Sequence, residues 1–295
     1  GMTINRFCAS GLQSVALAAA RIRLGEADVM IAAGTESMSM VPMMGNKVAI
    51  NPATFTHQEH VAIAYGMGMT GEKVAEQWHI SREAQDEFAL TSHRRALQAI
   101  DSGEFKQEIS PYQVVEKRPD LEADKVLEQV SLKDTDEGPR ADTSLEVLAK
   151  LRPVFSAKGS VTAGNSSQMS DGAGAVVLMN EKAMQRFNLS PLARFIGFSV
   201  AGVPPEIMGV GPIKAIPKVL AQTNIKQDDI DWIELNEAFA AQSLAVIHDL
   251  ALDREKVNPL GGAIALGHPL GATGAIRVAT LLHGLRRHHK KYGMV

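Results

Sequence analysis

Asn5-Arg6-Phe7-Cys8-Ala9-Ser10-Gly11-Leu12-Gln13 places the only cysteine of the 295-residue chain at the start of a predicted helix. A run of small residues follows from Ala16 to Ala20, and Gly25 is positioned to end that helix. A thiol in the first turn lies at the positive end of the helix dipole, so we expect a lowered pKa and a nucleophilic thiolate. A free cysteine is also commonly a small buried hydrophobe, and position alone does not decide between the two roles.

Two later segments bear on that choice, namely Trp232-Ile233-Glu234-Leu235-Asn236-Glu237-Ala238-Phe239-Ala240 and Gly261-Gly262-Ala263-Ile264-Ala265-Leu266-Gly267-His268-Pro269-Leu270-Gly271-Ala272-Thr273-Gly274. Together with the cysteine segment they resemble the signature blocks of the thiolases, which cleave or form 3-ketoacyl-CoA. The three blocks lie far apart and in the family's order, so the resemblance covers essentially the whole chain. It favours the nucleophile over the buried hydrophobe.

The resemblance implies a layered α/β/α/β/α fold of two similar halves, with a loop domain inserted in the first half. The first half would comprise residues 1–38 and 166–188, the loop domain 39–165, and the second half 189–295. An internal echo agrees with two similar halves, because Cys8-Ala9-Ser10-Gly11 and Gly271-Ala272-Thr273-Gly274 each open an Ala-rich helix. Thiolases also carry β-α units before the cysteine segment and a second cysteine in a Cys-x-Gly turn just beyond the position of Val295. We therefore expect this sequence to be an internal piece of a thiolase.

Composition excludes several classes of protein. Hydrophobic residues make up 45% of the chain, but no uninterrupted apolar stretch approaches 18 residues, so we expect no membrane span. Thirty basic and 33 acidic residues give a net charge of −3, which argues against a nucleic-acid surface. A single cysteine rules out an internal disulfide framework and fits a reducing compartment. With no signal-peptide pattern, we expect a cytoplasmic protein.

Periodicity predicts a buried strand at 29–33 after the cysteine helix, in the βαβ alternation of a covered parallel sheet. Ser81 is a predicted N-cap for a helix that runs to about Ile100. The charged segment 116–142 contains Pro119, Gly138 and Pro139, and we predict loops there. Further strands are predicted at 173–179, 192–200 and 232–235, and further helices at 181–187, 213–222, 238–252 and 272–288.

Cleaving a carbon–carbon bond beside a carbonyl requires a nucleophile, a base, an acid and oxyanion donors. His268, in its Gly-rich turn, is the predicted base for Cys8, and the other eight histidines are interpreted as capping or solvated. Asn236 ends a predicted strand, where its amide can hold a water that donates to an oxyanion. It can equally be the N-cap of the next helix, and both roles can hold. Glu237 is expected to orient its neighbours.

The resemblance also implies where coenzyme A binds as a substrate. Phe155 would contact the adenine, Ala163 and Ser167 would line the pantetheine tunnel, and Arg140 would lie near the nucleotide phosphates. Met67 and Phe239 are further predicted substrate contacts. Many thiolases have a histidine at the position of Gly66, so one polar pantetheine contact is in doubt. No metal and no bound cofactor are expected.

The resemblance favours a degradative 3-ketoacyl-CoA thiolase that acts in fatty-acid β-oxidation through an acyl-cysteine. Acetoacetyl-CoA synthesis by the same machinery is the alternative. A second alternative is an inactive fragment or binding remnant, since the second cysteine is absent. Decarboxylating ketoacyl synthases share the fold, but the Asn-Glu-Ala-Phe and Gly-His-Pro blocks favour thiolase. A homodimer or homotetramer is expected, and a β-oxidation partner subunit is a further candidate partner.

Overall fold

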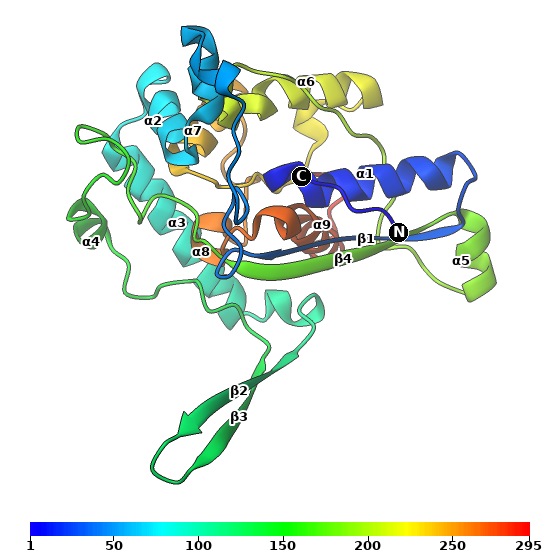
Figure 1. Cartoon of the computed structure of the whole chain (residues 1–295). Helices are drawn as coiled ribbons and strands as arrows, with labels where there is room; N and C mark the ends of the chain where they lie inside the picture. Colours follow the sequence, from blue (N-terminus) through cyan, green and yellow to red (C-terminus); the bar gives the residue numbers. More distant parts are fainter.

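A computed structural model describes all residues, 1–295, and its centre is a two-stranded antiparallel sheet (Figure 1). Strand β1 (Val29–Ser37) pairs with β4 (Asp171–Met179) from Val29 opposite Met179 to Ser37 opposite Asp171. Helices α1 (Ser10–Arg23) and α9 (Leu270–Arg287) cover one face of this sheet, where small and aliphatic side chains of both strands are packed. On the opposite face the alternate residues Val29, Ile31 and Val177 are exposed. The prediction of a parallel pairing is wrong for this sheet, because periodicity reports which face is buried and not the strand direction.

The remaining elements are mostly short and surround this centre. None of the helices combines the length and the apolar character needed to cross a membrane. The helices and turns are η1 (Phe7–Ala9), η2 (Pro52–Phe55), η3 (Gln58–Ala64), α2 (Met67–Gln77), α3 (Arg82–Asp101), η4 (Glu104–Gln107), α4 (Leu145–Ala149), α5 (Glu181–Phe187), η5 (Pro205–Val210), α6 (Gly211–Thr223), η6 (Gln227–Asp229), α7 (Ala240–Asp249) and α8 (Ala263–Leu266). The strands are β2 (Tyr112–Asp120), β3 (Lys125–Lys133), β5 (Trp232–Ile233) and β6 (Gly293–Met294).

Several predicted elements are confirmed, and their local causes are visible. Helix α3 starts where predicted, since the Ser81 hydroxyl accepts a hydrogen bond from the Ala84 N–H at 3.1 Å. Strand β4 and helix α5 also lie where periodicity placed them. Helix α6 continues through Pro217, as expected. The predicted cysteine helix and C-terminal helix are α1 and α9.

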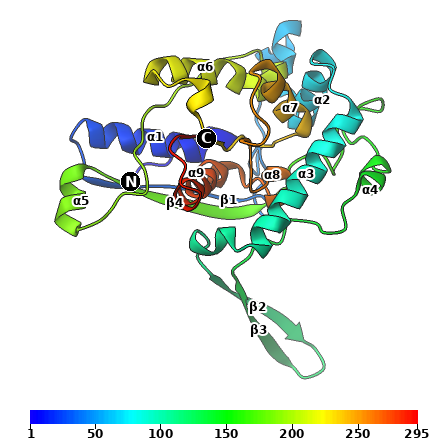
Figure 2. The same cartoon turned by 180° about the vertical axis from the view of Figure 1, so that it is seen from behind.

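Two predictions are wrong. Much of the expected loop at 116–142 lies in the β2–β3 hairpin, which projects away from the body of the molecule (Figure 2). Its strands are almost entirely exposed and carry charged pairs such as Lys117 and Glu128, 3.4 Å apart, so they have no buried face for periodicity to report. The predicted strand at 192–200 forms no regular element, because no other strand lies beside it to complete its hydrogen bonds.

The largest buried apolar cluster lies in the second half of the chain. It joins α7 and β5 to α3, and Ile264 is its most enclosed large side chain. A smaller cluster surrounds Trp232 and contains residues of α9 and of the segment that follows α3. Strand β5 is only two residues long, shorter than the predicted 232–235, and pairs in parallel with β6.

Three backbones meet at the centre of the molecule without side chains between them. A β-carbon built on Gly274 of α9 would lie 2.1 Å from the Leu12 nitrogen of α1. One built on Gly11 would lie 2.5 Å from the Ala275 nitrogen, and one built on Gly34 of β1 would lie 2.0 Å from the Gly271 carbonyl oxygen. These glycines set the spacing of the two helices and the strand beneath them.

Replacing Gly274 by alanine should separate the two helices. We expect G274A to lower the free energy of unfolding by about 2–3 kcal/mol, because the methyl group would overlap the α1 backbone. Denaturant unfolding followed by circular dichroism measures the change. G211A at the start of α6 is the matched control, since nothing lies within 4 Å of a β-carbon at that position. Equal stability of the two variants would contradict the close contact.

A group of buried charges lies beside the second half of α9. Arg277 is 3.4 Å from the fully buried Glu234, whose carboxylate also accepts a hydrogen bond from the Trp232 indole at 2.7 Å. Glu108 accepts a hydrogen bond from Thr280, also on α9, at 2.8 Å, but its other carboxylate oxygen has no partner. Burial raises the pKa of Glu108 and of Glu234 to about 7.

Glu108 should make the stability depend on pH. Its raised pKa means that the stabilising neutral form is fully populated below pH 4.5 and is lost as the pH rises through about 7. E108Q should therefore unfold like the wild type at low pH and be more stable by about 2 kcal/mol at pH 8. Urea midpoints measured across this range test the effect, with E122Q in the exposed hairpin turn as control. A parallel pH dependence of E108Q and wild type would refute it.

Candidate active site

Cys8 lies in a tight turn immediately before α1. Phe7 has a φ of +46°, in the left-handed region that is unfavourable for a bulky residue. The turn is held by local hydrogen bonds: the Ser10 hydroxyl donates to the Phe7 carbonyl at 2.7 Å and accepts from the Arg6 N–H at 2.8 Å. Asn5 also accepts from the Phe7 N–H at 2.8 Å. This turn holds Cys8 at the start of the helix with its thiol partly buried.

His268 faces Cys8 from the turn before α9. Its Nε2 atom is 3.0 Å from the Cys8 Sγ, although the two residues are 260 positions apart. On the other side of the ring, Nδ1 is 2.7 Å from the Thr273 hydroxyl. Gly267 permits this turn, since it has a φ of +90° and a β-carbon there would lie 2.3 Å from the Ser170 hydroxyl. The His268 side chain is buried, so the Sγ–Nε2 contact is shielded from bulk water.

Asn236 lies beside the Cys8–His268 pair. Its Nδ2 atom is 3.3 Å from His268 Nε2, while its Oδ1 atom is buried and has no hydrogen-bond partner in the protein. The alternative that Asn236 caps the following helix is wrong, because α7 begins at Ala240 with Phe239 at its N-cap. The free Oδ1 is therefore available to a water or a substrate group.

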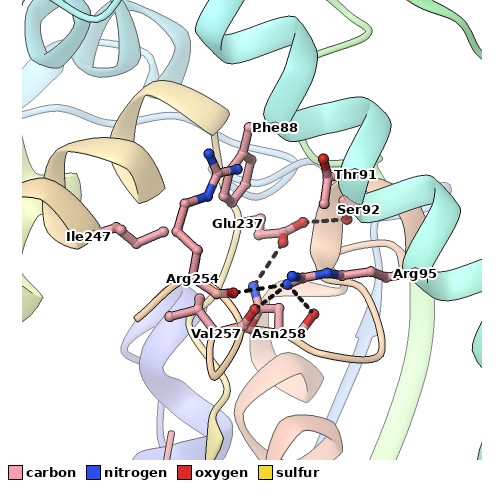
Figure 3. Close-up of a pocket in the computed structure, with 9 residues that line it drawn as sticks. All are labelled: Phe88, Thr91, Ser92, Arg95, Glu237, Ile247, Arg254, Val257 and Asn258. Carbon is pink, nitrogen blue, oxygen red and sulfur yellow. Dashed lines mark hydrogen bonds between the residues drawn. The ribbon is translucent and has the colours of Figure 1, made fainter. Parts of the chain in front are cut away.

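Glu237 anchors the segment that carries Asn236 (Figure 3). Its carboxylate accepts hydrogen bonds from Ser92 of α3 at 2.7 Å and from the Asn258 amide at 2.8 Å. Asn258 in turn donates to the Leu235 carbonyl at 2.7 Å and accepts from the Leu235 N–H at 2.8 Å. Beside them Arg95 donates to the Val257 carbonyl at 2.8 Å. This network fixes the backbone on either side of Asn236.

Burial makes charge costly for the reacting pair. It raises the pKa of the Cys8 thiol to about 11; the thiol's bond to its own backbone N–H opposes this rise, and the charge of Glu36 adds to it. Burial, helped by the charge of Arg277, lowers the pKa of His268 to about 4. The expectation that the helix dipole lowers the pKa of Cys8 is therefore wrong, because desolvation outweighs it. At neutral pH the resting pair is a neutral thiol and a neutral imidazole.

Two of the predicted ligand residues pack together beside α2. The rings of Phe155 and Phe239 meet edge to face with centroids 6.2 Å apart. They lie against two glycines one turn apart: a β-carbon on Gly68 would lie 2.2 Å from the Phe155 ring, and one on Gly71 would lie 3.1 Å from Phe239. Met67, another predicted contact, is the first residue of the same helix. A β-carbon on Gly66 would meet nothing within 4 Å, so that position is open.

The predicted pantetheine stretch is joined to the catalytic segment through its backbone. The Ser167 N–H donates to the Ala238 carbonyl at 3.0 Å, and the Ala240 N–H donates to the Asn165 carbonyl at 2.9 Å. Ala163 is exposed and Ser167 is half-buried. Arg140 is exposed, and its backbone N–H donates to His93 of α3 at 3.1 Å. The guanidinium of Arg140 contacts none of the other predicted ligand residues.

Sequence reasoning missed three residues that shape the site. Thr273 contacts His268. Its position five residues after His268 in the same glycine-rich block is the sequence feature that could have pointed to it. Glu36 of β1 accepts a hydrogen bond from the Gly271 N–H at 3.0 Å and so occupies the N-terminus of α9. Glu72 of α2 accepts hydrogen bonds from the Ser160 and Val161 N–H groups at 2.9 and 3.0 Å, which ties the predicted pantetheine stretch to that helix. No local pattern in the sequence pointed to either glutamate.

A cysteine beside a buried histidine, with an amide at the same point, is an arrangement suited to nucleophilic catalysis by a thiol. The family model described as "Thiolase, N-terminal domain" matches residues 1–182, and "Thiolase, C-terminal domain" matches residues 189–295. The chain belongs to the thiolase family.

Individual relatives agree with this family assignment. The chain is 48% identical to the 3-ketoacyl-CoA thiolase of Bacillus subtilis over 294 residues, which cover 100% of this chain and 74% of that protein. It is 45% identical to the acetyl-CoA acetyltransferase of Escherichia coli over 305 residues, with coverage of 100% and 75%. The crystal structure of the dimeric peroxisomal thiolase of Saccharomyces cerevisiae superposes with a TM-score of 0.86 at 45% identity, covering 96% of this chain and 69% of the yeast chain. These relatives are longer than this chain, and their folds confirm the predicted α/β thiolase class.

The neutral pair predicts slow alkylation of the resting enzyme. At pH 7 iodoacetamide should modify Cys8 more slowly than an ordinary thiol, because the pKa near 11 leaves little thiolate. The rate should rise about tenfold per pH unit between pH 7 and 9. Mass spectrometry of the intact protein follows the reaction, with the urea-unfolded chain as control. A rate that is already constant at neutral pH would indicate a thiolate–imidazolium pair instead.

Proposed function

We propose that Cys8 accepts the acyl group in the thiolytic cleavage of 3-ketoacyl-CoA to acetyl-CoA and a shortened acyl-CoA. The observation that carries the proposal is the 3.0 Å contact between Cys8 Sγ and His268 Nε2 in a buried setting. A thioester to Cys8 is the natural intermediate, because an acyl group taken from carbon can then be passed from one thiol to the thiol of CoA.

The first half-reaction begins with a proton transfer. His268 Nε2 takes the proton of the Cys8 thiol as Sγ attacks the 3-keto carbonyl carbon. The C2–C3 bond then breaks, its electron pair leaves with the acetyl-CoA enolate, and the enolate is protonated to acetyl-CoA. In the second half-reaction the acid that protonated the enolate takes the proton of an incoming CoA thiol, whose sulfur attacks the acyl-cysteine while His268 still holds the Cys8 proton. Cys8 leaves as the thiolate and recovers a proton from His268, and the shortened acyl-CoA is released.

Oxyanion stabilisation would come from groups around Cys8. The free Oδ1 of Asn236 can accept a hydrogen bond from a water that donates to the oxyanion. The Cys8 backbone N–H would supply part of a second oxyanion site, and protonated His268 would contribute to the first. In the family's pattern the enolate proton comes from a second cysteine in a Cys-x-Gly turn. Residues 1–295 contain one cysteine.

We propose coenzyme A as a substrate and no resident cofactor or metal. Phe155 would contact the adenine, Ala163 and Ser167 would line the pantetheine tunnel, and Arg140 would lie near the phosphates. Met67 and Phe239 would make further contacts with the substrate. The paired rings against Gly68 and Gly71 support this assignment, since they place aromatic surface beside the segment that carries Asn236. Degradation is preferred over acetoacetyl-CoA synthesis, although relatives of both names match at similar identity.

We further propose a homodimer in the cytoplasm. The yeast relative is titled as dimeric, and the exposed apolar residues on one face of the β1–β4 sheet are consistent with association. The proposal extends to a homotetramer and to a β-oxidation partner subunit. The cytoplasmic assignment follows from the need for a reduced thiol at Cys8.

Residues 1–295 should acylate Cys8 without sustained turnover. Incubation with acetyl-CoA should add one acetyl group to Cys8, detected by mass spectrometry, while steady-state thiolysis of acetoacetyl-CoA stays at background because no second thiol protonates the enolate. H268N should slow the acylation by about 10²–10⁴-fold through loss of the base. H79N is the control, since His79 is exposed and its φ of +53° suits asparagine. Acylation of a C8A variant would overturn the proposal.

A further inference from the structure

We propose that Thr273 is a positioning residue that fixes His268 in the Nδ1–H form and so keeps Nε2 free to take the Cys8 proton. This inference rests on the proposed function, because it concerns the same proton transfer. It deepens that proposal by naming the group that decides which ring nitrogen acts.

The argument starts from the hydrogen bonds of the Thr273 hydroxyl. Its Oγ1 is 3.1 Å from the Pro269 carbonyl oxygen, which can only accept, so the hydroxyl hydrogen points there. The same Oγ1 is 2.7 Å from His268 Nδ1. With its hydrogen already donated, Oγ1 can only accept at that contact, and Nδ1 must carry the hydrogen. In a neutral imidazole Nε2 is then unprotonated and accepts.

The groups on the other side of the ring agree with this assignment. The Asn236 amide nitrogen, 3.3 Å from Nε2, can only donate, and the Cys8 thiol, 3.0 Å away, carries the proton to be transferred. Both contacts are therefore satisfied by an unprotonated Nε2. Thr273 and His268 are both buried, so no bulk water competes to hold the other tautomer.

The choice of a hydroxyl rather than a carboxylate has a chemical consequence. A carboxylate beside Nδ1 would stabilise the imidazolium and hold the proton on the histidine. The neutral Thr273 oxygen orients the ring without that effect, so His268 can return its proton to the departing Cys8 thiolate. The residue is fixed in the first turn of α9, where its N–H also donates to the Pro269 carbonyl at 2.9 Å.

The test compares T273V, which removes the hydroxyl at nearly constant shape, with T273S, which retains it. T273V should slow acetyl transfer to Cys8 by about 10- to 100-fold, the range expected when a buried donor loses its acceptor. T273S should keep most of the wild-type rate. T223V is the matched control: Thr223 on α6 donates to the Val219 carbonyl at 2.8 Å, four residues back, as Thr273 does to Pro269.

A second readout separates positioning from packing. Nitrogen-15 NMR of His268 should show Nδ1 protonated and Nε2 unprotonated in the wild type and T273S, and a shift toward protonated Nε2 in T273V. Wild-type rates and tautomer in T273V would overturn the inference, as would T273S being as slow as T273V while still folded. If the wild type transfers no acyl group to Cys8, the proposed function fails, whereas the NMR comparison still decides the role of Thr273.

Discussion

Direct backbone contact between α1 and α9 is the constraint on which the rest of the structure depends. Gly11 and Gly274 bring the two helices together with no side chain between them, and Gly34 brings the strand beneath them equally close. Cys8 lies three residues before one of these glycines, and His268 lies six residues before another. These close backbone contacts fix how the chain segments carrying the thiol and the imidazole approach each other.

The site formed where α1 and α9 meet depends on two groups that are uncharged at rest. Burial disfavours both the thiolate of Cys8 and the imidazolium of His268, so the resting pair is neutral. Charge would develop only while the proton moves and the carbonyl is attacked, and Asn236 lies where that charge would appear. Glu237 and its partners hold the amide in place from behind. A nucleophile that is activated only during the reaction is protected from adventitious electrophiles.

The sequence predicted the family, the main helices and the residues that meet at the site, because glycine-rich blocks and buried periodicity are strong local signals. It failed where structure depends on partners that periodicity does not report. The segment 192–200 has the residue pattern of a strand but forms no strand in the structure. The two strands of the 112–133 hairpin pair with each other, although their exposed residues gave no sign of a buried face. The pKa of Cys8 was misjudged because the helix dipole is visible in sequence and desolvation is not. Thr273 was missed because its role depends on where its hydroxyl hydrogen points.

The separation of Cys8 and His268 by 260 residues has a consequence for how the enzyme is made. The nucleophile leaves the ribosome long before its base, which lies in the turn before α9. Contacts of such long sequence separation form late, because the entropy of closing the loop must be overcome first. A nascent chain would therefore carry Cys8 as an unassisted thiol, and acyl transfer would become possible only when α9 docks on α1. Catalytic competence in this architecture would thus report the long-range docking of α9 on α1.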